Sequence, residues 1–335
     1  FAKRSEAKAH LAWVESRIAE GTYVEASRER APFEQYADQW WRSRGFAKAA
    51  KRNTDNALRL HILPKFGGIP IGRIDRAMVQ DFVNELHAAK GLRASTIRNI
   101  LDVLTRMLRD AVDERHLARS PIPARGPGGI HIPGREEIRE RYLTRQEVGA
   151  LLRAAPREFA PLVVVMADSG LRIGEALGLN AGAIDLDHGI IRVDRQLTQD
   201  GEVTHTKTRS TRSVPLSPAA QKALEPLLVG KQPQDPIWLN SEGGRLRYQT
   251  CRRAWKLIVE RSSLDWSPVL HDLRHYYASV LLKEGVAITE VSRALGHASP
   301  TKTLSVYAHV IGDAHDGFRR VLNSQTWADG QTTAS

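Results

Sequence analysis

Cysteine, long apolar runs and metal-ligand clusters are what this 335-residue sequence lacks. Its single cysteine, Cys251, excludes a disulfide within the chain and fits a reducing compartment. No run of about 18 apolar residues occurs, so we expect no membrane span. No Asp, Glu, His or Cys set has metal-ligand spacing, and the sequence predicts neither a metal nor another cofactor. The chain starts at Phe1 without a signal-peptide pattern, so we expect a fragment that lacks something upstream.

Negative charge is also in short supply. Lysine and arginine number 49 against 38 aspartates and glutamates, which gives a net charge of +11 and a pI near 9.9. Such a balance favours a polyanionic partner. An anionic membrane surface is the rival, but no long basic amphipathic helix or anchor motif is visible. Since 41% of the residues are hydrophobic, the composition is that of a globular protein, and double-stranded DNA is the expected partner.

Prolines and glycines concentrate between residues 121 and 140, where they predict a linker between two compact domains. The sequence before this linker shows helical periodicity, and the sequence after it mixes helices with a few strands. We therefore expect a mainly α fold with a small β-sheet or hairpin. The expected parts are a helix and linker (1–30), a basic helical domain (31–120), the Pro/Gly linker (121–140), a second domain (141–322) and a flexible tail (323–335).

Local signals place several boundaries. Asp75 is a good N-cap, and Thr144 followed by Glu147 forms a capping box. Ser217 before a proline also predicts a helix start. Pro64 is expected to end the helix that opens near residue 54. Alternating or short apolar segments predict strands at 190–193, 203–208 and 212–216, and helices are expected at 249–260, 273–284 and 289–295.

The helix expected to start at Ser95 has apolar residues at a 3.6-residue period and a basic outer face. Two interpretations of this face stay open. It is either a solvated surface or a DNA contact, because only two aspartates balance its arginines. The arginines are Arg93, Arg98, Arg106 and Arg109.

The residues that carry chemistry lie close together near the end of the sequence. His271-Asp272-Leu273-Arg274-His275, Leu295-Gly296-His297 and Tyr307 place imidazoles, a guanidinium and a phenol within about forty residues. Cations hold a phosphodiester, and a phenol can attack it. Forming the phenolate at pH 7 costs roughly 4 kcal/mol, which nearby arginines can offset. A phosphotyrosine keeps the bond energy, so rejoining needs no ATP.

Six residues in this order resemble the tyrosine recombinases, specifically the phage-type integrases. Ser169-Gly170-Leu171-Arg172-Ile173-Gly174-Glu175 is similar to the family's first arginine motif, and Lys207 precedes Val214-Pro215-Leu216 as the family's hairpin lysine does. The resemblance is strong over 141–322 and less specific over 31–120. The six residues are Arg172, Lys207, His271, Arg274, His297 and Tyr307.

The resemblance implies a core-site DNA-binding domain followed by a tyrosine recombinase catalytic domain. It implies that Tyr307 attacks the phosphate while two arginines grip the non-bridging oxygens. It also implies that Lys207 protonates the 5′ leaving group, that His271 supports proton transfer, and that His297 hydrogen-bonds the phosphate. Glu175 is expected to orient Arg172. Residues 1–30 resemble the remnant of an N-terminal arm-binding domain.

Each site residue also has a plainer interpretation. Arg172 could merely pair with Glu175, and His297 could cap its own helix. Tyr307 could be a buried aromatic side chain. Arg209 or Arg212 could share the charge role of Lys207. We expect a structural role for His275.

The implied function is site-specific recombination, most of all the integration and excision of a phage or other mobile element in the cytoplasm of a bacterial host, at the nucleoid. Resolution of chromosome or plasmid dimers is the alternative within the family. A non-catalytic DNA-binding regulator is the alternative from another class. The resemblance implies a homo-tetramer acting through a Holliday junction, with the segment after Tyr307 on a neighbour or folded back on its own domain. A directionality factor stays open as a further partner.

Overall fold

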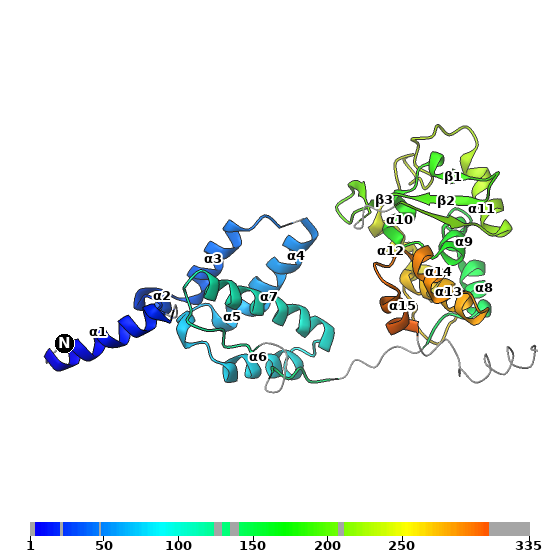
Figure 1. Cartoon of the computed structure of the whole chain (residues 1–335). Helices are drawn as coiled ribbons and strands as arrows, with labels where there is room; N and C mark the ends of the chain where they lie inside the picture. The colour runs from blue at the N-terminus through cyan, green and yellow to red at the C-terminus, as the bar shows by residue number, and fades with distance from the viewer. Residues whose placement is uncertain are drawn as a thin grey trace, which may run out of the picture. The chain divides into compact units, whose positions relative to one another are not determined.

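The structure is a computed structural model that describes residues 4–20, 23–46, 48–123, 129–134, 141–206 and 211–307. The chain divides into two compact units, residues 1–138 and residues 139–335, and each is described by itself. Helices dominate both units, and the second adds two small sheets (Figure 1). The expected fold class, mainly α with a small β component, is confirmed.

The first unit is built from helices alone in the residues described. An aromatic face of α3 supplies its largest buried rings, from Phe33, Tyr36 and Trp40. Tyr36 and Trp40 also satisfy their polar atoms inside the core, on the Met107 carbonyl and the Asp110 carboxylate. The elements are α1 (Arg4–Ala19), α2 (Ala26–Arg30), α3 (Phe33–Ser43), α4 (Lys48–Ala57), η1 (Leu58–Ile62), α5 (Leu63–Phe66), η2 (Ile71–Arg73), α6 (Arg76–Ala88) and α7 (Ala94–Asp113).

The prediction that Pro64 ends a helix is wrong. The chain is already helical at Lys48 and stays so through α4, the π-helical segment η1 and the short helix α5. Pro64 lies in the first turn of α5. The π-helical segment η1 lies directly before α5, and such a segment lets a helical run continue past a residue that has no N–H to donate.

Two helices of the first unit test the sequence signals further. Asp75 is the N-cap of α6, and its side chain accepts a hydrogen bond from the Met78 N–H at 2.8 Å, as predicted. Helix α7 begins at Ala94 with Arg93 as N-cap, so Ser95 lies inside the first turn instead of capping it. The apolar side of α7 is buried, and its four arginines are exposed: Arg93, Arg98, Arg106 and Arg109.

The second unit places a three-stranded antiparallel sheet, ordered β1-β2-β5, beside its helices. Strands β3 and β4 form a separate hairpin. Its elements are α8 (Arg145–Ala154), α9 (Ala160–Ser169), α10 (Ile173–Gly178), η3 (Ala181–Ala183), β1 (Ile184–Asp185), β2 (Ile190–Val193), β3 (Arg195–Leu197), β4 (Val203–His205), β5 (Arg212–Pro215), α11 (Pro218–Leu228), α12 (Tyr248–Arg261), α13 (Leu270–Lys283), α14 (Ile288–Leu295) and α15 (Pro300–Tyr307).

Helix α9 lies at the centre of this unit and buries apolar side chains on most of its surface, because α8, α11 and α13 all pack against it. Helix α14 packs against α13, α15 and β5. In Figure 1, α8, α13, α14 and α15 lie below the sheet, whereas α11 lies beside it. The predicted caps at Thr144 and Ser217 are confirmed, since their hydroxyls accept hydrogen bonds from the backbone N–H groups of Glu147 and Ala220. This packing brings the ends of α9 and α14 beside the first turns of α10 and α13.

Candidate active site

The turn after α9 requires a glycine. Gly170 has a φ of +60°, and a Cβ at this position would collide with the ring of Tyr277. The carbonyl of Gly170 accepts a hydrogen bond from Arg274 Nη1 at 2.7 Å. Two residues later Arg172 is the N-cap of α10. The turn therefore presents one arginine and anchors another.

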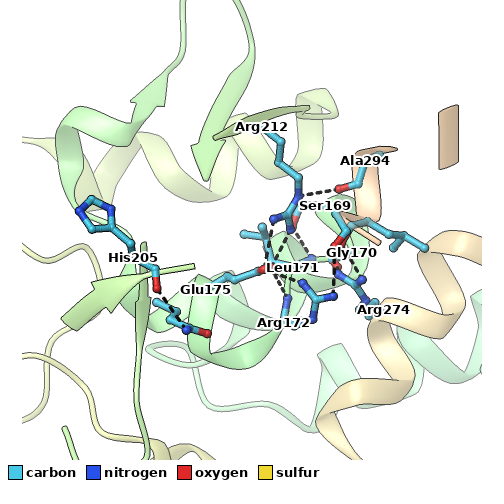
Figure 2. A network of polar contacts seen from close by, with 12 residues as sticks. Ser169, Gly170, Leu171, Arg172, Glu175, His205, Arg212, Arg274 and Ala294 are labelled. Carbon is cyan, nitrogen blue, oxygen red and sulfur yellow. Dashed lines mark hydrogen bonds and ion pairs between the residues drawn. The ribbon is translucent and has the colours of Figure 1, made fainter. Parts of the chain in front are cut away.

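Three consecutive carbonyls at the C-terminal end of α14 receive three arginines from different parts of the unit (Figure 2). Ala294 O accepts from Arg212 Nε at 2.8 Å, and Leu295 O accepts from Arg274 Nη2 at 2.6 Å. Gly296 O receives a longer contact of 3.4 Å from Arg172 Nη2. The negative end of a helix dipole favours cations at this place. His297 follows directly, so these contacts set its backbone.

A buried carboxylate joins two of these arginines. Glu175 is 2% exposed and shares its two oxygens between Arg172 and Arg212. Burial alone would raise the pKa of Glu175, but the hydrogen bond and charge of Arg212 and the contacts of Arg172 outweigh it and lower that pKa. The group is therefore a carboxylate at neutral pH. Arg172 pairs with Glu175 at 2.8 Å and keeps 38% of its side chain exposed.

Arg274 and two histidines complete the basic cluster. Arg274 is 2% exposed, and burial followed by the charge of Arg172 lowers its pKa to about 9, so it stays protonated at pH 7. Burial lowers the pKa of His271 to about 4, with His275 and Arg274 adding to the effect. Burial, then Arg274 and Arg172, lowers the pKa of His297 to about 4 as well. Both imidazoles are neutral at pH 7 and can accept hydrogen bonds.

Tyr307 is the last residue of α15 and is 1% exposed. Its hydroxyl lies 2.7 Å from Nδ1 of His275. Burial raises the pKa of the Tyr307 phenol, although the nearby positive charge of Arg274 acts in the opposite direction. The ring of Tyr142 lies near both rings, with centroid distances of 5.9 Å to His275 and 6.0 Å to Tyr307, and its own hydroxyl donates to the Val306 carbonyl at 3.1 Å. The phenol is therefore neutral at pH 7 and has an imidazole as a partner.

The structure brings together five of the six predicted site residues. Arg172, Arg274 and His297 meet at the end of α14, His271 lies one turn before His275 on α13, and Tyr307 contacts His275. Lys207 lies outside the described residues, and so does the segment that follows Tyr307. The four arginines of α7 belong to the first unit.

Sequence reasoning missed three contacts. Arg212 was considered only as a substitute for Lys207, yet its side chain faces Glu175 and α14. His275 was expected to be structural, yet it holds the Tyr307 hydroxyl. Tyr142 was not considered. The spacing of His271 and His275 by one helical turn was the available signal for the second, whereas no local pattern marks the others.

Basic groups, neutral imidazoles and a phenol around one helix end are suited to phosphodiester chemistry, in which fixed donors stabilise charge on the phosphate oxygens. Within the described residues, no group of three or more His, Cys, Asp or Glu side chains could hold a metal ion. None of the helices in the described part of the chain is long and apolar enough to cross a bilayer.

Comparisons with known proteins agree with this geometry. The model of the phage integrase family matches residues 141–312, and that of the phage integrase N-terminal SAM-like domain matches residues 32–87. Tyrosine recombinase XerC of Bacillus subtilis (strain 168) is 26% identical over 259 residues, which cover 72% of this chain and 79% of that protein.

Two solved structures share the fold. The Tn1549 transposon integrase in complex with transposon right end DNA superposes with a TM-score of 0.75 at 19% identity, over 88% of this chain and all of that chain. A lambda integrase tetramer bound to a Holliday junction gives a TM-score of 0.66 at 18% identity, over 90% of this chain and 81% of that chain.

Proposed function

Because this chain belongs to the phage integrase family of tyrosine recombinases, which cleave and rejoin DNA through a tyrosine intermediate, we propose that Tyr307 is its nucleophile and that the arginine cluster at the end of α14 binds the scissile phosphate. One observation carries the proposal. Arg172 and Arg274, about a hundred residues apart in sequence, contact neighbouring carbonyls of the turn that precedes His297.

The arginines stabilise the charge that develops on the non-bridging oxygens. Each guanidinium has five N–H groups, so the contacts to backbone carbonyls and Glu175 leave further donors for a phosphate. Fixed donors of this kind contribute about 3–4 kcal/mol each, because they need no reorganisation during the reaction. His297, held by Thr303 at 2.8 Å through Nδ1, supplies a further hydrogen bond from its other ring nitrogen.

Cleavage requires two proton transfers, one from the nucleophile and one to the leaving group. The Tyr307 phenol passes its proton to the imidazole of His275, whose Nδ1 lies 2.7 Å from the hydroxyl, as it attacks the phosphorus, and the 5′ oxygen gains a proton as it leaves. We assign the second proton to Lys207, and His271 supports the transfer as a neutral imidazole. The 3′-phosphotyrosine then keeps the energy of the broken bond, so a 5′-hydroxyl can rejoin the strand without a metal or ATP.

The reaction requires two duplexes, and four copies of the chain on them account for two rounds of exchange through a Holliday junction. The tetrameric arrangement of lambda integrase on such a junction supports this part of the proposal, because the fold is shared. In this scheme the first unit, with the basic face of α7, holds the core site.

A covalent trapping experiment tests the nucleophile. Wild-type protein should form an adduct with a nicked suicide substrate that carries its core site, and Tyr307→Phe should bind the same DNA within about threefold but form no adduct. The buried Tyr277→Phe is the matched control and should keep the adduct. An adduct at normal yield from Tyr307→Phe would place the nucleophile elsewhere.

For the biological role we propose integration and excision of a phage or other mobile element. Helix α1, which lies before the matched regions, supports this choice, because the family's arm-binding domain occupies this place. Resolution of chromosome or plasmid dimers is the second candidate, which the similarity to XerC favours.

Sequencing the DNA trapped on Tyr307 in the source cells separates the two roles. Junctions between an element and its host support integration. One site within a circular replicon, identical in both partner strands, supports dimer resolution and excludes integration as the main role.

A further inference from the structure

Arg212 is the most completely engaged arginine around the proposed reaction centre. It opens β5, its side chain is 9% exposed, and its guanidinium forks onto Glu175, with Nη1 to Oε1 at 3.1 Å and Nη2 to Oε2 at 2.7 Å. Nε donates to Ala294 O at 2.8 Å. All three nitrogens therefore face protein groups (Figure 2). This orientation favours a role within the protein over the direct charge role that the sequence left open.

The first group that Arg212 controls is Arg172. Both oxygens of Glu175 are shared between the two arginines, because Oε1 also accepts Arg172 Nη1 at 2.8 Å and Oε2 accepts the Arg172 backbone N–H at 2.9 Å. The carboxylate is buried, so its position depends on these partners. Without Arg212, half of the hydrogen bonds that fix Glu175 are lost, and Arg172 is held by a carboxylate that can rotate.

The second group is the turn that bears His297. Arg212 holds the carbonyl of Ala294, three residues before that histidine. Gly296 lies between them with a φ of +65°, and a Cβ there would come within 2.9 Å of Arg212 Nη1. The turn and the arginine are therefore packed against each other without room for a side chain.

We propose that Arg212 is a positioning residue that couples two parts of the reaction centre, namely Arg172 through Glu175 and His297 through Ala294. The proposal rests on the proposed function of Arg172, and its test distinguishes a failure of this coupling from a failure of the proposed function. It assigns to Arg212 no contact with the DNA. Its effect is to place groups that do contact the phosphate.

Single-turnover cleavage by Arg212→Lys, in the full chain, tests this role on two suicide substrates. One has an ordinary scissile phosphate, and the other has a neutral methylphosphonate in its place. Lysine keeps the charge but cannot fork onto a carboxylate. Cleavage of the phosphate should fall about 100-fold, as for loss of one oxyanion donor. On the methylphosphonate, cleavage should fall by about 10-fold or less, because a neutral linkage depends less on Arg172. DNA affinity should stay within about threefold.

Arg192→Ala is the matched control, since Arg192 is exposed on β2 opposite Ser213, the neighbour of Arg212. It should cleave both substrates like wild type. An equal loss from Arg212→Lys on both substrates would show a general loss of folded domain and overturn the proposal. A parallel loss of DNA affinity would make Arg212 a DNA contact and overturn it too.

If Arg212→Lys does not fold, Glu175→Gln repeats the test. The amide keeps the shape of the carboxylate and removes its charge, so the same substrate-dependent pattern is expected, and a substrate-independent loss overturns the coupling. Failure of the proposed function itself has a different signature, because wild-type protein would then form no adduct through Tyr307 on either substrate.

Discussion

At the scale of single residues, the hydrogen bond between His275 and Tyr307 is the contact whose loss has a stability cost that can be measured directly. The phenol is buried, and its hydroxyl meets Nδ1 of His275 at 2.7 Å. A buried hydroxyl that loses its partner costs about 1–3 kcal/mol of stability. The pair therefore links the fold of the second unit to the placement of the proposed nucleophile.

A double-mutant cycle measures this link. His275→Phe keeps a ring of similar size but removes the acceptor, and it should lower the free energy of unfolding by about 1–3 kcal/mol in urea. In a Tyr307→Phe background, where no hydroxyl remains, the same change should cost less by about 1 kcal/mol or more. Equal costs in the two backgrounds would mean that the hydrogen bond contributes no stability.

The lowered histidine pKa values predict how stability depends on pH. His271 and His297 have pKa values of about 4 in the folded chain, whereas an unfolded histidine has a value near 6.5. Between these values the unfolded chain binds protons that the folded chain does not. Stability should therefore fall as the pH drops from about 6.5 to 4.

Urea unfolding at pH 7 and pH 5 checks this expectation. The midpoint of the second unit should be lower at pH 5, and His271→Asn should reduce the difference because it removes one of the two groups. A midpoint that is equal or higher at pH 5 would contradict burial as the cause of the low pKa values.

At the scale of secondary-structure elements, the turn between α9 and α10 controls the site through its backbone. Gly170 combines a left-handed conformation with close contact to Tyr277, and its carbonyl anchors Arg274. Gly285, after α13, has a φ of +84° and open space around it. The two glycines thus separate conformational strain from crowding.

Gly285→Ala should cost about 1 kcal/mol, from the left-handed backbone alone. Gly170→Ala should cost about 1–3 kcal/mol more, since the added methyl group collides with the Tyr277 ring. Urea unfolding measures both values, and DNA cleavage should fall further in the Gly170 variant as Arg274 shifts. Similar costs at the two positions would show that the ring moves aside freely.

Elements with a local signal were predictable from the sequence. The caps at Asp75, Thr144 and Ser217 depend on residues three positions apart, so their pattern is visible in the letters. Pro64 led to a wrong prediction because a proline normally ends a helix, and the sequence does not show that the π-helical segment η1 lets the helical run continue past it. The strands β1 and β3 were missed, since two or three residues carry no usable periodicity.

The site was predictable to the extent that it depends on residue type and order. Arg172, His271, Arg274, His297 and Tyr307 were visible as an ordered set of reactive side chains. The contacts between them were not, because each joins segments far apart in sequence. Glu175 and Arg212 are 37 positions apart, and no pattern within one element reveals that their side chains meet.

At the scale of the whole molecule, the excess of positive charge governs how DNA binding responds to salt. With a net charge of +11, binding should weaken steeply as salt increases, because each neutralised phosphate releases counterions. Arg106→Gln and Arg109→Gln, on the exposed face of α7, should each reduce the slope of log K against log salt by about 1.

Fluorescence anisotropy with a core-site duplex over a range of salt concentrations measures the slope. Lys65→Gln is the control, because Lys65 on α5 already pairs with Glu85 at 2.6 Å, and its slope should match wild type. A slope unaffected by the α7 changes would make that face a solvated surface.

The end of α14 has a consequence for turnover. Three guanidinium groups crowded into one place repel each other, and a site assembled only by its substrate would fall apart whenever the strand departs. Here each cation has a backbone oxygen of its own, and Glu175 pairs with two of the three, so the protein itself holds the assembly together without the DNA phosphate. We therefore expect the site to keep its arrangement when the rejoined strand is released, so that it is ready for the next reaction in either direction.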